Sequence, residues 1–224
     1  MNFKTSYRLL VVFALIALSL IGCTSAPTYE FPESIDPSQR YMFYLHGKIL
    51  EDQGLPAISP EYGEYEYEAI LEALHEHGFV VISEQRPKNA DGFVFAKRVR
   101  KQVQALLEAG VPPQNITVVG ASKGAAITVL VSNLLENDEA NFVLLGACHP
   151  DTVGEFMRDQ VRLVGNVLSI YDSVDKWAGS CQEFFSFSEL SNADEIVLEI
   201  GTGHGILYQH LDEWVFPTVE WAKE

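Results

Sequence analysis

The chain has 224 residues, with 31 acidic and 15 basic side chains and a formal net charge of −16 at pH 7. That length is enough for one well-packed domain and little more. So acidic a chain repels nucleic acid and anionic lipid headgroups. The composition therefore excludes a nucleic-acid-binding protein and a peripheral protein that a basic patch holds on a membrane.

The first 22 residues predict a signal peptide, because a positively charged start precedes a short apolar run. Lys4 and Arg8 lie ahead of Leu9–Ile21, a run too short to span a bilayer comfortably. The run ends at Leu20-Ile21-Gly22-Cys23, which resembles the lipobox of bacterial lipoproteins. The resemblance implies that Cys23 is lipidated and becomes the new N-terminus. A plain secretory signal or an uncleaved anchor with an incidental cysteine is the alternative.

The residues after the lipobox indicate a destination and a tether. Thr24, rather than aspartate, follows the cysteine, which resembles the pattern of lipoproteins sent to the outer membrane of Gram-negative bacteria. We therefore expect an exported, membrane-anchored lipoprotein that faces the periplasm. Loss of residues 1–22 removes two basic and no acidic side chains, so the net charge becomes −18 and attachment depends on the lipid. Residues 23–39 carry three prolines without periodicity and predict a tether, and residues 40–224 form the domain.

From Tyr41 onward, short apolar segments alternate with helix-like patterns. The predicted strands are Tyr41–Leu45, Phe79–Ser83, Ile116–Val119, Phe142–Leu145, Val167–Tyr171 and Glu195–Ile200. The predicted helices are Tyr65–His77, Phe93–Ala109, Ser122–Leu135, Val153–Val161 and Leu211–Trp221. This alternation, with strands that are apolar throughout, predicts an α/β fold with a mostly parallel sheet of about six strands and helices on both faces.

The segment Gly120-Ala121-Ser122-Lys123-Gly124 lies between a predicted strand and a predicted helix. A serine on so tight a turn has a strained backbone, and side chains at the two glycine positions would collide with their surroundings. The strain lifts the hydroxyl clear of the sheet, and the helix behind it directs amide groups toward an oxyanion. Strand, turn and helix together indicate a nucleophile elbow, rather than an ordinary glycine-rich turn.

Polar residues follow the other strands where a parallel sheet places its chemistry, at the carboxyl ends. His46-Gly47-Lys48 follow the first predicted strand, Asp172 and Asp175 follow the fifth, and His204 follows the sixth. With Ser122, the chain order is serine, aspartate and histidine.

These motifs, in this order, resemble the α/β-hydrolase superfamily, as a compact, lidless member without the first two strands of the larger fold. The resemblance implies that Ser122 is the nucleophile and that His204 takes and returns its proton. It also implies that the backbone amides of Lys48 and Lys123 form the oxyanion hole.

The triad acid has two candidates. In the family, the acid commonly lies several residues past its strand, and aligning Tyr171-Asp172-Ser173-Val174-Asp175 on that form places Asp175 in the catalytic position. Asp172 then occupies a position that is usually glycine. It could instead cap the turn, as aspartates at loop entries often do.

Of the three cysteines, Cys148 and Cys181 remain once Cys23 is assigned to the lipid. Both follow predicted strands at the same rim, and an exported compartment is oxidising, which favours a disulfide over two buried thiols. No spacing of histidine, cysteine and carboxylate residues indicates a metal site, and Lys123-Gly124 reverses the order of a phosphate loop. We therefore expect neither a metal nor a cofactor.

The sequence thus predicts a serine hydrolase that cleaves an ester or related acyl bond of a small molecule through an acyl-enzyme. A peptidase or amidase would use the same triad. The alternative from another class is a non-catalytic surface lipoprotein that binds a ligand or partner with this fold. Glu84 and Arg86 follow a strand and could contact substrate, but they are interpreted as surface salt-bridge residues. The oligomeric state is left open.

Overall fold

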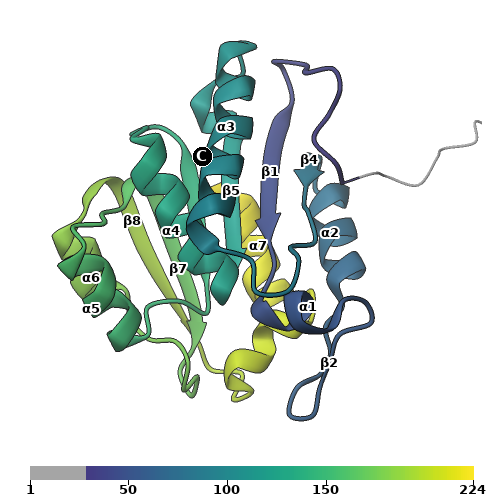
Figure 1. Ribbon diagram of the computed structural model, residues 1–224, viewed down its shortest axis with the longest axis vertical. Coiled ribbons are helices and arrows are strands. Elements are labelled where there is room, and N and C mark those ends of the chain that lie inside the picture. Colours follow the sequence, from purple (N-terminus) through teal and green to yellow (C-terminus); the bar gives the residue numbers. More distant parts are fainter. Residues whose placement is uncertain (1–28) are drawn as a thin grey trace, which may run out of the picture.

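Six parallel strands form the central sheet of the computed structural model, which describes residues 29–224 (Figure 1). In sheet order β4-β1-β5-β6-β7-β8, the strands are β4 Phe79–Ile82, β1 Arg40–Leu45, β5 Ile116–Ala121, β6 Asn141–Leu145, β7 Val164–Asp172 and β8 Glu189–Leu198. A separate two-stranded hairpin pairs β2 Ile58–Ser59 with β3 Gly63–Glu64. The predicted signal peptide and Cys23 lie outside the described residues.

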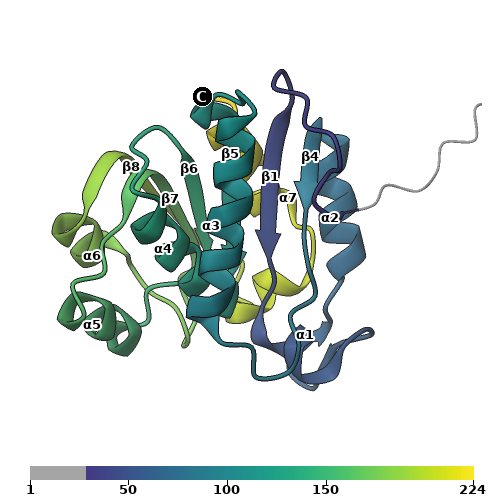
Figure 2. The same cartoon turned by 45° about the horizontal axis from the view of Figure 1, so that its top comes forward.

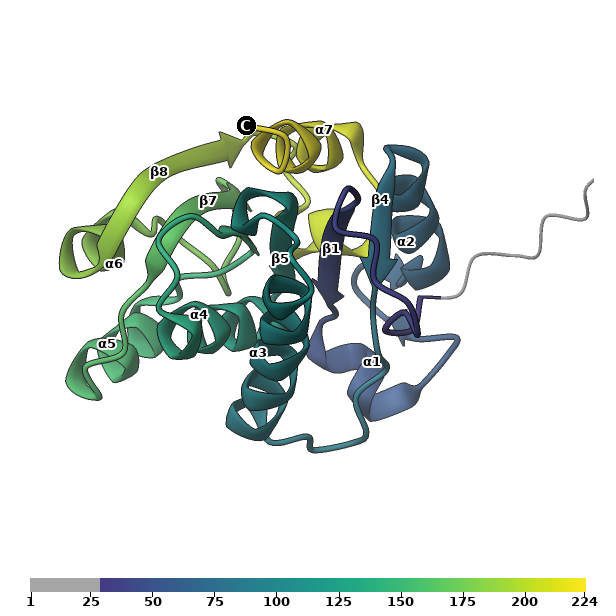
Figure 3. The ribbon, with the colours of Figure 1, turned by 90° about the horizontal axis from the view of Figure 1, so that it is seen from above.

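Helices cover both faces of the sheet. They are α1 Lys48–Gln53, α2 Tyr67–Glu76, α3 Gly92–Glu108, α4 Lys123–Leu135, α5 Pro150–Arg158, α6 Gln182–Phe187 and α7 Asp212–Trp221. Two short 3-10 helices are Pro113–Asn115 and Gly203–Tyr208. Seen from above, α3, α4 and α5 lie on one side of the curved sheet and α7 on the other (Figure 3).

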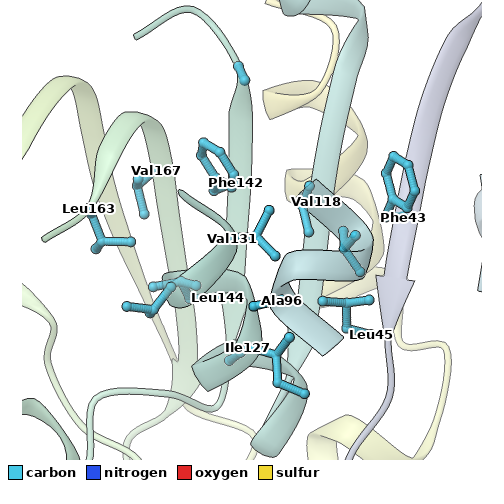
Figure 4. Packing of buried hydrophobic residues seen from close by; sticks show 14 of the residues in the cluster. Phe43, Leu45, Ala96, Val118, Ile127, Val131, Phe142, Leu144, Leu163 and Val167 are labelled. Carbon is cyan, nitrogen blue, oxygen red and sulfur yellow. The ribbon is translucent and has the colours of Figure 1, made fainter. Parts of the chain in front are cut away.

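The strands contribute side chains to two hydrophobic cores, one on each face of the sheet, because successive side chains of a strand point to opposite faces. In β1, Phe43 joins the core beneath α3 and α4, whereas Met42 and Tyr44 join the core beneath α2 and α7. Figure 4 shows the first core, in which Val131 of α4 and Ala96 of α3 pack toward the strands. Burial on both faces explains why the strands are apolar throughout.

The strand order reverses at β1, which lies between β4 and β5 in the sheet (Figure 2). The next strand in the chain, β4, is added on one side of β1, and the later strands are added on the other side. The connections to those two strands run on opposite faces, through α2 and α3. Ligands of open α/β sheets bind beyond the carboxyl ends of the strands at such a point. Here that position brings the residues after β1 and β5 together.

The α/β class and the six parallel strands confirm the sequence prediction, but several elements differ from it. The last strand begins at Glu189, not Glu195, and the short helices α1 and α6 and the hairpin were not expected. Part of the segment expected to be a tether lies against the domain: the Ser83 amide donates to the Tyr29 carbonyl at 2.7 Å, and Phe31 and Ile35 pack on the first core. Within residues 29–224, no helix is both long and apolar enough to cross a membrane.

Candidate active site

Ser122 lies at the sharp turn between β5 and α4, with a φ of 53° and a ψ of −117°. Few residues other than glycine adopt a positive φ, and holding one there costs about 1–3 kcal/mol. The turn also needs its two glycines. A β-carbon at Gly120 would lie 2.3 Å from the Gly124 carbonyl oxygen, and one at Gly124 would lie 1.8 Å from the Leu45 carbonyl oxygen. The backbone is therefore too crowded there for any larger residue.

Ser122, His204 and Asp175 form a continuous chain of hydrogen bonds. The Ser122 Oγ lies 2.8 Å from His204 Nε2, and His204 Nδ1 lies 2.7 Å from Asp175 Oδ2. The Asp175 side chain is fully buried and that of His204 is 12 % exposed. A carboxylate that accepts the Nδ1 proton leaves Nε2 free to accept the serine proton.

Of the two candidate acids, the structure brings Asp175 to the histidine and gives Asp172 other partners. Asp172 Oδ1 accepts from the Val174 amide at 3.0 Å, and its Oδ2 accepts from the amides of Ile200 and Gly201 at 3.0 and 2.8 Å. Asp172 thus ties the loop after β7 to the loop after β8. These hydrogen bonds hold the turn between Asp172 and Asp175.

His204 lies in the 3-10 helix Gly203–Tyr208 and not in an open loop. Ile206 and Leu207 of the same helix are buried in the core beneath α2 and α7. This packing anchors the short helix and hence the imidazole.

Lys48 and Lys123, the residues expected to supply oxyanion amides, are the first residues of α1 and α4. The N–H groups at the start of a helix have no acceptor within it, so both amides are free to meet a substrate oxygen. The two helix starts are close to each other. A β-carbon placed on Gly47 would lie 3.8 Å from the Ser122 Cβ.

A buried ion-pair network joins these two helix starts. One carboxylate oxygen of Glu51, in α1, accepts a hydrogen bond from Arg86 Nε at 2.7 Å. The other accepts one from Lys123 Nζ at 2.6 Å. The Glu51 and Arg86 side chains are 0 % and 1 % exposed. Burial raises the pKa of Glu51, but hydrogen bonds from Lys123 and Arg86 outweigh it and hold the pKa below its ordinary value.

The interpretation of Arg86 as a surface salt-bridge residue is wrong, whereas that of Glu84 fits its exposed pair with Arg98 at 2.8 Å. Arg86 also donates through Nη2 to the His46 carbonyl, and its amide donates to His46 Nε2 at 2.9 Å. Sequence reasoning missed Glu51 altogether. Its one signal is an acidic residue in the first turn of a helix too short to be recognised.

His46 is an uncharged structural ring in this network. Its Nδ1 donates to the Gly47 carbonyl at 2.8 Å while its Nε2 accepts from the Arg86 amide. Burial, with a smaller effect of the Arg86 charge, lowers the pKa of His46 to about 4. The ring therefore stays neutral at physiological pH and fixes the backbone that leads into Lys48.

Cys148 and Cys181 are joined by a disulfide, with the two Cα atoms 5.2 Å apart. Cys148, Ser122 and His204 line the same hollow of about 550 Å³. Another hollow, of about 870 Å³, lies beside β4 and is lined by neither Ser122 nor His204, so its size does not make it the site. Within residues 29–224, no three histidine, cysteine or carboxylate side chains are grouped to hold a metal ion.

The sheet order, the strained serine after β5 and the residues at the strand ends together define the α/β-hydrolase fold. Solved structures with this fold support the assignment. A variant of SOBER1 from Arabidopsis thaliana matches with a TM-score of 0.56 and 13 % identity, over 82 % of this chain and 98 % of that one.

Two further structures match with a TM-score of 0.51 and 15 % identity. One is a predicted CIB-like hydrolase from Thermoplasma acidophilum, which matches over 85 % of this chain and 89 % of that one. The other is esterase 2 from Thermogutta terrifontis, which matches over 86 % of this chain and 85 % of that one. No family model matches the chain, and no curated protein matches it. At these identities the likeness establishes the fold.

Proposed function

We propose that this protein is a serine hydrolase that cleaves an ester or related acyl bond through an acyl-enzyme on Ser122. The observation that carries the proposal is the partly buried hydrogen-bonded chain from Ser122 through His204 to Asp175. These are the parts, in the order, that activate a serine for acyl transfer. Strain held at Ser122 adds support, because such strain persists where function requires it.

In the proposed mechanism, His204 Nε2 removes the proton from Ser122 Oγ as the oxygen attacks the acyl carbon. The amides of Lys48 and Lys123 receive the negative oxygen of the tetrahedral intermediate, and each such donor is worth about 100-fold to 1000-fold in rate. His204 then passes the proton to the leaving group. Water, activated by the same nitrogen, releases the acyl group, while Asp175 stabilises the charged imidazole throughout.

A fluorophosphonate probe tests the nucleophile. Esterase 2 of Thermogutta terrifontis, which shares the fold, is phosphonylated by sarin, so a related reagent suits this site. We expect stoichiometric labelling of the wild-type domain and none of the Ser122→Ala variant, because the alanine has no oxygen to phosphonylate. Mass spectrometry of the intact protein gives the readout.

Ser173→Ala is the matched control, since Ser173 is exposed and lies outside the hydrogen-bonded chain. Equal labelling of wild type and Ser122→Ala would show that Ser122 is not the nucleophile. Absence of labelling in the folded wild type would favour the non-catalytic binding protein instead.

We propose in addition that the protein is exported and held on the outer membrane by a lipid on Cys23. The lipobox-like segment supports this, and a disulfide in the folded domain suits an oxidising compartment. We expect labelled palmitate to enter the full chain in a Gram-negative host but not the Cys23→Ser variant. Equal incorporation into both would contradict lipidation at Cys23.

A further inference from the structure

The hollow beside Ser122 extends along α4 and is walled by α5 and α6. One side of it is apolar and consists of side chains from the three helices, namely Ala126, Val129, Val153, Phe156 and Phe184, while Tyr62, His149, Thr152 and Tyr208 also line it. The rings of Phe156 and Phe184 stack with their centroids 5.7 Å apart. Contact with so much apolar surface favours an apolar ligand group, because burial removes that group from water.

The disulfide holds one wall of this hollow. Cys148 lines the hollow in the segment after β6, and Cys181 immediately precedes α6, the helix that carries Phe184. The covalent link therefore fixes α6 to the end of the sheet beside the nucleophile. A helix of six residues has little stability of its own, so the disulfide helps to keep α6 in place beside the hollow.

Among the described residues that line the hollow, the basic side chains are Lys123, His149 and His204, and none is a carboxylate. Lys123 is the one lysine, arginine or carboxylate residue in the lining, and its ammonium group is held by Glu51 at 2.6 Å and by the Ala90 carbonyl at 2.7 Å. A charged ligand group placed against the apolar side chains would lose its water without gaining a partner. The side of the hollow formed by apolar residues of α4, α5 and α6 therefore favours an uncharged group.

The apolar lining runs along one face of α4. Ser122, Ala126 and Val129 recur at the spacing of one helical face, and seven residues of α helix advance about 10 Å. An extended chain covers roughly 3.5 Å in three bonds, so about nine bonds span that distance. An octanoyl chain on Ser122 would therefore reach almost as far as Val129 along this face.

We propose that this hollow is the acyl subsite of the hydrolase and that it takes an unbranched, uncharged acyl chain of six to eight carbons. The proposal rests on the proposed function, since the acyl group is the part that stays on Ser122. The leaving group departs where His204 delivers a proton, and the lining residue Trp177 is 64 % exposed, so the hollow is open to solvent at that residue. The apolar side of the hollow thus remains for the acyl chain.

Two series of esters test this assignment. With p-nitrophenyl esters from acetyl to dodecanoyl, we expect kcat/KM to rise by up to about fourfold for each methylene buried, to peak at hexanoyl or octanoyl, and then to fall. With acetate esters of lengthening alcohols, we expect no comparable rise. A flat acyl series, or a rise confined to the alcohol series, would overturn the proposal.

Shortening the subsite should move this optimum. Val153→Phe adds a ring from α5 to the hollow, so we expect the ratio of kcat/KM for octanoyl ester to that for acetyl ester to fall at least tenfold. Glu155→Phe is the matched control, because Glu155 is exposed on the same helix outside the lining. A folded Val153→Phe variant with the wild-type profile would contradict the assignment.

A second variant applies if Val153→Phe does not fold. Ala126 is only partly buried on α4, so Ala126→Leu obstructs the same hollow with less strain in the core, and we expect the same shift toward short chains. Ala105→Leu on α3 is its control. Fluorophosphonate labelling separates the two failures: a labelled enzyme with a flat acyl profile refutes the subsite alone, whereas an unlabelled one refutes the hydrolase.

Discussion

Replacing Asp175 by asparagine should lower the turnover of an activated ester by about ten-thousandfold while leaving the fold intact. The reason is which nitrogen of the His204 imidazole carries the proton. Asp175 Oδ2 now accepts from His204 Nδ1 at 2.7 Å, which leaves Nε2 as a base toward Ser122. An amide in that place can donate to Nδ1 and favour the tautomer with its proton on Nε2. Steady-state kinetics with p-nitrophenyl hexanoate measures the loss of turnover. An equal Tm for the variant and the wild type shows that the fold is intact.

Asp172→Asn is the comparison that decides between the two acids. Its carboxylate accepts three backbone amides, from Val174, Ile200 and Gly201, so the variant should lose about 1–3 kcal/mol of stability. Its turnover at 20 °C should fall far less than that of Asp175→Asn. If Asp175→Asn is nearly normal and Asp172→Asn is inactive though folded, Asp172 is the acid.

Replacing Glu51 by alanine should cost about 3–5 kcal/mol of unfolding free energy, because it leaves the Arg86 guanidinium buried without its partner. The Arg86 side chain is 1 % exposed and cannot reach water instead. The variant also frees Lys123, whose ammonium group bonds to Glu51 at 2.6 Å. Urea unfolding at pH 7, with the m-value compared with wild type, gives the change.

Asp52→Ala is the matched control for this prediction. Asp52 is the next residue of α1 and pairs with Lys48, but both side chains are well exposed, at 36 % and 55 %. Exposed pairs contribute about 0–1 kcal/mol, so this variant should unfold almost as wild type does. A loss for Glu51→Ala no greater than for Asp52→Ala would show that the buried network does not stabilise the fold.

Much of the fold follows from local sequence patterns. Apolar runs such as Phe142–Leu145 are long enough and regular enough to be recognised as strands, because a strand buried on both faces needs no polar position. The short helices are different. Lys48–Gln53 and Gln182–Phe187 have six residues each, fewer than two turns, so no helical periodicity can develop in them.

The sequence by itself determined the α/β class, the turn around Ser122 and the candidate residues at the strand ends, because each depends on neighbours within a few positions. The tertiary structure decided which of two aspartates meets His204, since Asp172 and Asp175 leave the same strand three residues apart. It also decided that Glu51 pairs with Arg86, 35 residues later in the chain. Both pairings depend on how separate loops and helices are placed next to each other in the folded protein. No local sequence pattern encodes the distance between residues that lie far apart in the chain.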